Sequence, residues 1–380
     1  MIAVEVVSGI ASLERWLDDW ERLFSSGRYE PSTSYEWTAA LLRSHRREGR
    51  RVHLLILKEQ GEIVGLVPLV ADTDHLFGLP LITVRPLSEL YDTHSDFLIQ
   101  GDADAGIAAV LDALDANSIR WDVFRVSRLV EHLPITEAFE RLTAARDRPR
   151  RIQYTPPSFY LELPASMHAY LAQRSGKFRN HLKRTEKKLL AQGEVEFGCV
   201  AGDTDIEQAY QDILHVESNS WKHAHGTAIS TVAHQSVFYK ELCLAAARTN
   251  RLHLSFLRLN GEPVAYNLGY FHDHRYAYLK TSYHEAYRDL GIATYSRAQL
   301  IGQVIGQGGR YFDFPGEPYE WEQQWTKALR WHRSITLFNR TPSARAFHFM
   351  GAIKRRFNGA HDDSKILEFC DARALRPPRA

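Results

Sequence analysis

The stretch YAYLKTSYHEAYRDLGIATYSRAQLIGQVIGQGGRYFDF, residues 276–314, decides the fold that we predict for this chain. Its pattern predicts a strand, a tight loop containing glycine, a helix and a second strand. In the loop Arg288–Ala293, Gly291 permits a sharp turn and Ala293 leaves room for a ligand, with Thr294 expected at the helix N-terminus. Free N–H groups at such a terminus bind phosphates. An ordinary strand-to-helix connection is the alternative that this stretch alone leaves open.

The composition is that of an ordered globular protein. Its 380 residues exceed one ordinary core, so we expect two domains. Lys and Arg number 47 against 46 Asp and Glu, and the net charge of +1 provides no general attraction to nucleic acid or membrane. Three widely separated cysteines do not suit a disulfide framework or a metal motif. We find no signal peptide and no membrane-spanning run, so we expect a cytoplasmic protein. Because the sequence has no metal motif, we expect no bound metal.

The chain contains an internal repeat. Residues 251–265, RLHLSFLRLNGEPVA, align without gaps on residues 51–65, RVHLLILKEQGEIVG, with seven of fifteen positions identical. The predicted strand around Asp313 also echoes the strand around Asp122, and each follows a predicted helix. Two echoes in the same order indicate two tandem copies of one α/β unit. Only the second copy carries the loop Arg288–Ala293.

The domain boundary is expected at the charged segment that precedes Pro156 and Pro157. This predicts an N-terminal domain over residues 1–150 that lacks the loop and a second domain over residues 151–345 that contains it. Residues 346–380 are expected to form a closing helix and a frayed tail.

Two segments between the copies carry further candidates. Residues 174–188, RSGKFRNHLKRTEKK, predict an amphipathic helix with a dense basic side. That side is either a solvated surface or a rim that faces phosphates. Further along, His215, Glu217 and Trp221 are candidates to line a cleft, although packing against a helix explains a tryptophan there equally simply.

The order of these motifs resembles the GNAT acyltransferase superfamily, and within it the tandem-domain branch related to FemAB peptidyltransferases and CelD-like polysaccharide-biosynthesis proteins. The resemblance rests on the basic helix, the GEPVAY hairpin, the YLKTSY strand, the GIA loop and the FDFPGE segment. It implies an α/β fold of two tandem GNAT-like domains, each a splayed, mostly antiparallel sheet flanked by helices. Arg288, Gly291 and Ala293 match the superfamily's acyl-CoA pyrophosphate pattern, whereas Asp289 and Leu290 depart from its fuller form.

The resemblance also implies direct attack of an amine on a thioester or ester carbonyl. The protein must orient both substrates, offer an N–H group to the oxyanion and accept a proton. We expect the thioester beside the first strand and the pyrophosphate at the loop and helix start. The expected contacts are Leu279, Lys280, Thr281 and Ser282 on the strand, and Arg288, Gly291, Ile292, Ala293 and Thr294 on the loop and helix.

Several residues are candidates for proton transfer and for binding the acceptor. Burial in its strand favours Asp313 as the base, but Asp122 in the copy without the loop makes a structural role equally acceptable. The other candidate bases are Glu217, His215 and Glu285. Tyr319 stands where the superfamily often has a tyrosine that protonates the leaving thiolate. The residues expected to contact the acceptor are Trp221, Lys177, Arg179, Tyr283 and Trp321.

The leading hypothesis is an N-acyltransferase that uses acetyl-CoA or another acyl-CoA and an amine acceptor on a small molecule, sugar or amino-acid derivative. The first alternative is a Fem-type peptidyltransferase that takes an aminoacyl group from tRNA. The basic helix favours this alternative, whereas the near-zero net charge does not. The second alternative is a non-catalytic binding module of an exopolysaccharide pathway.

Overall fold

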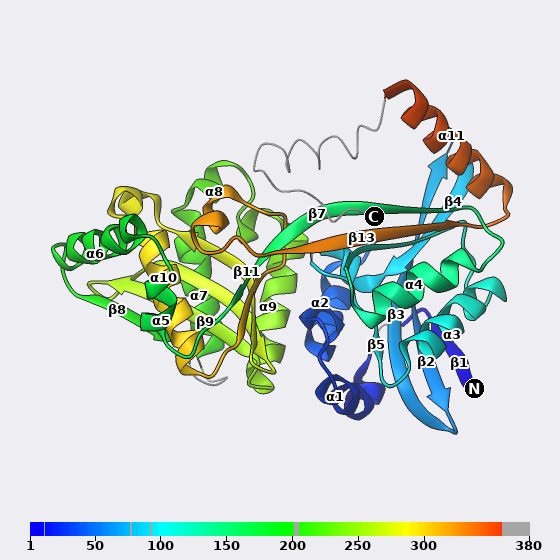
Figure 1. Cartoon of the computed structure of the whole chain (residues 1–380), viewed down its shortest axis with the longest axis horizontal. Helices are drawn as coiled ribbons and strands as arrows, with labels where there is room; N and C mark the ends of the chain where they lie inside the picture. The colour runs from blue at the N-terminus through cyan, green and yellow to red at the C-terminus, as the bar shows by residue number, and fades with distance from the viewer. Residues whose placement is uncertain (11, 77, 92, 201–204, 359–380) are drawn as a thin grey trace. The chain divides into compact units, whose positions relative to one another are not determined.

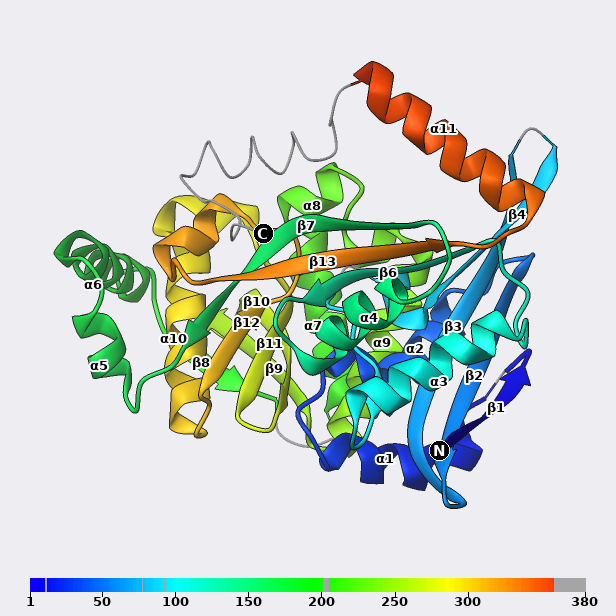
Figure 2. The same ribbon diagram turned by 45° about the vertical axis from the view of Figure 1, so that its right-hand side comes forward.

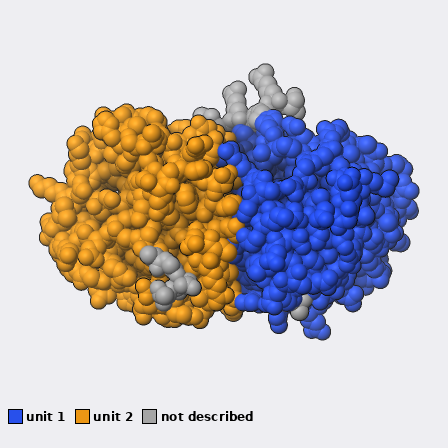
Figure 3. Space-filling model, turned by 90° about the horizontal axis from the view of Figure 1, so that it is seen from below, with its two compact units in different colours: residues 1–157, 330–380 blue, residues 158–329 orange. Residues whose placement is uncertain are grey.

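The computed structural model describes residues 1–10, 12–76, 78–91, 93–200 and 205–358. The chain forms two compact units (Figure 1 and Figure 3). Unit 1 comprises residues 1–157 and 330–380, and unit 2 comprises residues 158–329. The tail that we expected to fray after Ala372 lies outside the described residues, as does Cys370.

Unit 1 is a sheet flanked by helices. Its strands are β1 (Ile2–Ser8), β2 (Arg50–Glu59), β3 (Glu62–Leu76), β4 (Leu79–Pro86), β5 (Leu98–Ile99) and β6 (Val123–Val130). Its helices are α1 (Leu17–Ser25), α2 (Tyr35–Ser44), α3 (Ala103–Asp115), α4 (Pro134–Ala144) and α11 (Pro342–Asn358), with 3-10 turns η1 (Glu14–Trp16), η2 (Pro31–Thr33) and η3 (Leu87–Leu90). The capping side chains of Ser34 and Asp102 fix where α2 and α3 begin.

Unit 2 repeats this order of elements. Its strands are β8 (Val195–Cys199), β9 (Leu252–Leu259), β10 (Glu262–His272), β11 (Arg275–Tyr283) and β12 (Tyr311–Phe314). Its helices are α5 (Met167–Ala172), α6 (Gly176–Leu190), α7 (Ile206–Ser218), α8 (Trp221–Ala224), α9 (Ala233–Arg248) and α10 (Ile292–Gly306), with 3-10 turns η4 (Ile229–Thr231), η5 (Glu285–Leu290) and η6 (Glu320–Gln324). Two further strands pass between the units in sequence: β7 (Arg150–Glu162) and β13 (Leu329–Phe338).

Both sheets are mixed and mostly antiparallel, as the sequence predicts. Unit 1 has the strand order β1-β2-β3-β4-β6-β13, with β5 paired to β3, and unit 2 has the order β7-β12-β11-β10-β9-β8. Strand β4 pairs in parallel with β6, and β11 pairs in parallel with β12. The hairpins β2–β3 and β9–β10 and the pairs β1–β2 and β8–β9 are antiparallel.

Equivalent hairpins in the two units close with the same turn. Gln60 and Gly61 join β2 to β3 with φ of 53° and 91°, and Asn260 and Gly261 join β9 to β10 with φ of 52° and 85°. Positive φ at both central residues characterises the type I′ turn, which suits the twist of a hairpin. The aligned residues of the repeat therefore have the same conformation in both units.

The units differ from the sequence ranges that we expected for the domains. The last strand of unit 1 comes from the far end of the sequence, because β13 pairs with β6, whereas residues 159–162 of β7 pair with β12 within unit 2. Residues 330–345, which we assigned to the second domain, lie in unit 1, and the first boundary falls after Pro157. Pairing between strands so distant in sequence leaves no local pattern.

Helices cover both faces of the unit 2 sheet. Tyr266 of β10 donates a hydrogen bond to Glu217 on α7, whereas its neighbour Asn267 donates to Ser296 on α10. Successive strand residues point to opposite faces, so α7 and α10 lie on opposite sides of the sheet, as Figure 2 shows. Aromatic side chains of β7, β11 and β12 fill the core on the α10 side.

Candidate functional site

The sheet of unit 2 opens between β11 and β12. The parallel pairing of these strands runs from Arg275, opposite Tyr311, to Ala277, opposite Asp313, and then stops. Strand β11 nevertheless continues to Tyr283, still paired with β10 on its other side. One edge of β11 is therefore released from β12 beyond Ala277.

The release point coincides with a β-bulge. Leu268 of β10 faces Lys280, whereas the next residue, Gly269, faces Tyr278. Leu279 is consequently an extra residue in β11. A bulge re-aims the side chains and backbone groups beside it and is over-represented next to active sites. Lys280 and Tyr278 accordingly point to opposite faces, although two residues apart they would otherwise share one.

The backbone of Thr281 faces the opening. The N–H group of His284 donates to the carbonyl oxygen of Val264 at 2.8 Å, which makes the pair of Ala265 and Tyr283 a non-hydrogen-bonded one. Pairs alternate along an antiparallel ladder, so Thr281, two residues before Tyr283, also turns its N–H and C=O groups away from β10. The released edge thus offers the N–H group of Thr281 to an extended ligand.

Strand β11 leads through η5 into α10. Gly291 joins them in the left-handed conformation, with φ of +75°, and no side chain caps the helix there. The helix begins at Ile292, so Thr294 is its third residue and lies in the first turn. Arg288 is exposed and forms an ion pair with Glu285 at 2.9 Å. The N–H group of Thr294 donates to the carbonyl oxygen of Gly291 at 3.0 Å, whereas those of Ile292 and Ala293 precede the first intrahelical bond and can bind an anion.

The loop at Gly291 packs tightly against the basic helix α6. A Cβ atom on Gly291 would lie 2.9 Å from the Oγ1 atom of Thr185, which is buried on α6. Glycine is therefore needed here for two reasons: its φ is positive, and a Cβ atom would approach Thr185 too closely. The contact also places the basic helix beside the start of α10, which the sequence alone did not show.

The equivalent helix of unit 1 starts differently. Asp102 caps α3 with its own carboxylate, which accepts a hydrogen bond from the N–H group of Asp104 at 2.9 Å. A carboxylate in that place satisfies the terminus and repels a phosphate. The asymmetry between α3 and α10 agrees with the sequence, in which only the second copy carries the loop.

The basic side of α6 is exposed to solvent. Its charged side chains there are Lys177, Arg179, Lys183, Arg184, Lys187 and Lys188. Arg179 has a local structural role, because its Nη1 atom donates to the carbonyl oxygen of Arg174 at 2.6 Å. Lys177 lies in the first turn of α6, about two helical turns from Thr185, where α6 contacts Gly291.

A buried charged cluster lies on the α7 side of the sheet. The Glu217 carboxylate is fully buried and accepts from the Tyr266 hydroxyl at 2.7 Å, from Lys222 at 3.3 Å and from the N–H group of Ile229. Lys222, which the sequence analysis missed, also donates to the carbonyl oxygen of Thr281 in the opening. Its position one residue after Trp221 gave no separate signal.

Lys280 brings a second amine to this cluster. Its Nζ atom donates to the Gln235 side chain at 2.9 Å and lies 5.0 Å from the centre of the Tyr239 ring. Burial, together with the nearby Lys222 cation, lowers the pKa of Lys280 to about 8, although Glu217 opposes the shift. Burial also lowers the pKa of Lys222, against the attraction of Glu217.

Asp313 lies in the closed part of the sheet. Its side chain is buried and forms an ion pair with Arg275, in the segment where β11 and β12 still pair. Asp122 of unit 1 also has a structural role, because it accepts a hydrogen bond from the N–H group of Ile82 at 2.7 Å. These contacts support the structural alternative for Asp313.

Aromatic residues after β12 surround a buried arginine. The Arg297 guanidinium lies 3.8 Å from the centre of the Trp321 ring and donates to the Tyr278 hydroxyl at 3.2 Å. Tyr319 is exposed and stacks on Trp321 with 6.2 Å between ring centres. Burial raises the pKa of Glu322, in the same turn, to about 8. Arg297 carried no recognisable signal in the sequence.

The remaining candidates are dispersed. His215 is exposed, whereas Glu217 is buried, because residues two apart on a helix point in different directions. Trp221 is exposed and packs edge-on against His225. Tyr283 is half-buried and packs in the cluster around Ile292, at the start of α10.

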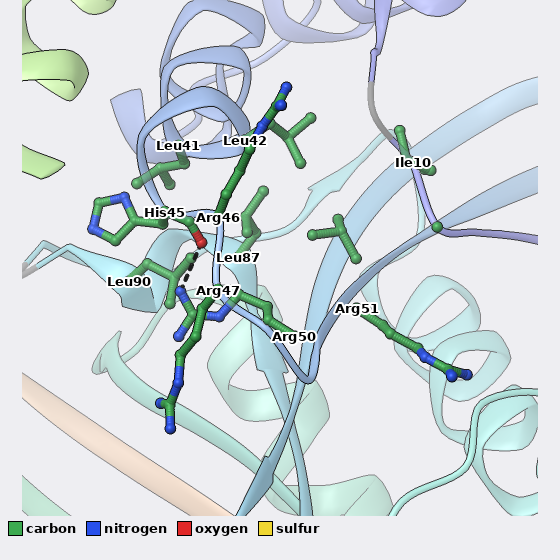
Figure 4. Close-up of a pocket in the computed structure, with 12 residues that line it drawn as sticks. Ile10, Leu41, Leu42, His45, Arg46, Arg47, Arg50, Arg51, Leu87 and Leu90 are labelled. Carbon is green, nitrogen blue, oxygen red and sulfur yellow. Dashed lines mark hydrogen bonds between the residues drawn. The ribbon is translucent and has the colours of Figure 1, made fainter.

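Unit 1 contains a separate pocket of about 310 Å³ (Figure 4). Leu42, Leu87 and Ile10 form its apolar wall, and arginines stand around it. Arg50 is held by Asp72 at 2.6 Å and does not stand free. In Figure 4 the arginine side chains point in different directions rather than toward one centre. None of the candidate site residues lines this pocket.

Two negative findings concern the described residues. Among them, no three His, Cys, Asp or Glu side chains are grouped so as to hold a metal ion. Across the same ranges, no helix is both long enough and apolar enough to cross a membrane.

Comparison with known proteins identifies the fold. Residues 176–323 match the family model described as an acetyltransferase (GNAT) domain. The structure titled FemX is similar with a TM-score of 0.62 at 11% identity, covering 87% of this chain and 97% of that one. Among curated proteins, none matches the chain significantly.

Two further solved structures are similar in fold to this chain. The C-terminal domain of a putative lysylphosphatidylglycerol synthetase from Agrobacterium fabrum has a TM-score of 0.52 at 10% identity, covering 90% of this chain and 96% of that one. A protein of unknown function from Bacteroides thetaiotaomicron has a TM-score of 0.51 at 10% identity, covering 85% and 97%. At these identities the likeness shows the fold alone.

Proposed function

We propose that this chain, which carries a GNAT acetyltransferase domain in a tandem GNAT arrangement, is an acyl-CoA-dependent N-acyltransferase. One observation carries the proposal: the edge of β11 that is released beyond Ala277 leads directly to the uncapped start of α10 at Gly291. An extended thioester donor fits this path, with its anionic end at a helix N-terminus.

Each end of the donor has candidate contacts. The pyrophosphate would lie on the N–H groups of Ile292 and Ala293 at the start of α10, with the exposed Arg288, which pairs with Glu285, nearby. The thioester would lie beside Leu279–Ser282, where Thr281 turns its N–H group outward. That N–H group is the candidate donor to the oxyanion.

The acceptor is proposed to be an amine of a small molecule, sugar or amino-acid derivative. Trp221, Tyr283 and Trp321 are proposed to contact it, and Lys177 and Arg179 would act only on a longer anionic acceptor, because they stand at the far end of α6. Tyr319 is exposed, and we propose it as the acid that protonates the leaving thiolate. These assignments rest on the resemblance to the superfamily.

Titration of the purified protein with acetyl-CoA by calorimetry tests the proposal. We expect saturable binding of one donor per chain, because α10 follows the released edge of β11, whereas its counterpart α3 in unit 1 is capped by Asp102. Coenzyme A should compete, since it carries the same pyrophosphate. An absence of heat at millimolar acetyl-CoA would overturn the proposal.

The exposed basic side of α6 supports a second candidate, an aminoacyl-tRNA-dependent transferase. Because α6 touches the loop at Gly291, a polyanion bound along the helix would reach the donor site. Affinity for tRNA should then fall steeply as salt rises, by roughly one unit of log–log slope for each phosphate neutralised. Filter binding of tRNA over a range of salt concentrations, without and with acetyl-CoA, distinguishes the two donors.

A further inference from the structure

We propose that the side-chain amine of Lys280 is the catalytic base, which takes the proton from the attacking amine. This inference rests on the proposed function and gives the same site its proton acceptor. It departs from Asp313, Glu217, His215 and Glu285, the bases considered from the sequence.

The cluster holds one carboxylate and two amines. Lys222 forms an ion pair with the carboxylate, because its Nζ atom lies 3.3 Å from Glu217. Lys280 is the excess cation: its hydrogen-bond partner is the neutral side chain of Gln235, and within the described residues no carboxylate forms an ion pair with it. A buried cluster approaches neutrality when one amine loses its proton, and the amine without a carboxylate loses it most readily.

The other groups of the cluster are unsuited to accept the proton. Glu217 already accepts three hydrogen bonds, so its lone pairs are engaged. Burial and the adjacent Glu217 keep the pKa of Tyr266 well above its usual value, so its hydroxyl stays protonated. Lys222 is fixed between Glu217 and the carbonyl oxygen of Thr281. The groups facing Lys280 are Glu217 from α7, Lys222 from α8, Gln235 and Tyr239 from α9, and Tyr266 from β10.

The bulge at Leu279 places Lys280 beside the reacting carbonyl. Without the extra residue, Lys280 would share the α10 face with Tyr278. With it, Lys280 points into the charged cluster, next in sequence to Thr281, whose backbone faces the opening. A neutral Lys280 can donate one hydrogen to Gln235 and still offer its lone pair to a substrate N–H group.

The proton and electron balance of the step is simple. The acceptor nitrogen forms a bond to the thioester carbon and gives one proton to the Nζ atom of Lys280. The carbon–sulfur bond then breaks and its electron pair leaves with sulfur. The Lys280 ammonium returns the proton to the thiolate through Tyr319 or water, so the products are an amide and the free thiol.

Lys280→Met and Lys280→Arg test the inference. Arginine keeps the charge and cannot act as a base at these pH values, whereas methionine keeps the approximate length without the amine. Thiol release from acetyl-CoA is followed with hydroxylamine, which is mostly unprotonated from neutral to alkaline pH, and the rate of thioester cleavage without enzyme is subtracted at each pH. Lys240→Met is the matched control, because Lys240 on α9 pairs at the surface with Glu207 at 3.0 Å.

We expect the wild-type rate to rise with pH and to level off above about 8, because Lys280 acts only after it has lost its proton. Both Lys280 variants should bind acetyl-CoA within about twofold of wild type and lose roughly a hundredfold or more in rate, together with this inflection. Lys240→Met should match wild type. Retention of rate and inflection by Lys280→Arg would overturn the inference while leaving the proposed function intact.

A second measurement does not depend on turnover or on the variants folding. Competitive acetylation of the intact protein with trace acetic anhydride, read by mass spectrometry over a range of pH, reports how each lysine titrates. We expect Lys280 to titrate near pH 8, well below the range of an ordinary lysine side chain near 10.4. An ordinary value for Lys280 would overturn the inference. If wild type fails to bind acetyl-CoA in calorimetry, the proposed function fails, and the inference fails with it.

Discussion

At the scale of single residues, Gly291 bears two independent constraints. Its φ of +75° disfavours any residue with a Cβ atom, at a cost of about 1–2 kcal/mol. A Cβ atom would also approach Thr185 to 2.9 Å at Oγ1 and 3.2 Å at Cγ2, so the loop or α6 would have to move. We therefore expect Gly291→Ala to lower the free energy of unfolding and to weaken acetyl-CoA binding, as measured by denaturant melts and calorimetry.

The control for this prediction is another left-handed glycine. Gly226 has φ of +67°, and a Cβ atom there meets nothing within 4 Å, so Gly226→Ala should carry the backbone cost alone. Adding Thr185→Ala to Gly291→Ala should recover the part of the loss that comes from the contact with α6. Equal losses for the two glycine variants, with unchanged acetyl-CoA affinity, would show that the contact has no role in the donor site.

At the scale of elements, the start of α10 contrasts with that of α3. Asp102 fills the end of α3 with a negative charge, and α10 has no such cap. A glutamate in the first turn of α10 should support the helix and repel the donor. We expect Thr294→Glu to keep or raise stability by a few tenths of a kcal/mol. Acetyl-CoA affinity should fall by about 1–3 kcal/mol, or roughly five- to 150-fold.

The neutral variant Thr294→Gln separates charge from size in this prediction. It has nearly the same shape as Thr294→Glu, so it should retain most of the affinity for acetyl-CoA. Calorimetry at low and high salt checks the origin of the difference, because screening should narrow the gap between the two variants. Equal affinities at low salt would mean that the pyrophosphate does not bind at this terminus.

At the scale of the whole molecule, the sequence predicted the repeat but not how the strands are shared. The aligned segments 51–65 and 251–265 form equivalent hairpins, because the residue pairs Gln60–Gly61 and Asn260–Gly261 encode the same local turn. The placement of β13 beside β6 was not predicted, because its partner residues, such as Phe338 and Val123, lie far apart in the chain.

The same division holds for the candidate site. The glycine of the donor loop and the strand before it were recognisable, because turn chemistry is local. The cluster of Glu217, Lys222 and Lys280 was not assembled, because it depends on a one-residue bulge that reverses the direction of Lys280. A period-two pattern places Lys280 on the face of Tyr278, and only the three-dimensional register shows otherwise.

The sharing of strands leads to a prediction about unit 1 alone. Residues 1–157 without β13 would lack Ile335 and Leu337, which belong to the core of unit 1. Burial of such side chains contributes about 1.5–3 kcal/mol each, a large part of an ordinary domain's stability. The shortened chain would also leave β6 as an unpaired edge, so we expect residues 1–157 to aggregate or to melt without cooperativity.

Restoring β13 should restore folding. The N–H group of Tyr160 donates to the carbonyl oxygen of Ala328 at 3.2 Å, so the chain enters and leaves unit 2 at neighbouring points. A short Gly-Ser linker can therefore replace residues 158–329 and join Pro157 to Arg330. We expect this chain to melt cooperatively by circular dichroism and to bind no acetyl-CoA, because it keeps β13 and lacks α10. If the linked chain melts no more cooperatively than residues 1–157, β13 is not what completes unit 1. If the linked chain binds acetyl-CoA, the donor site does not lie in unit 2.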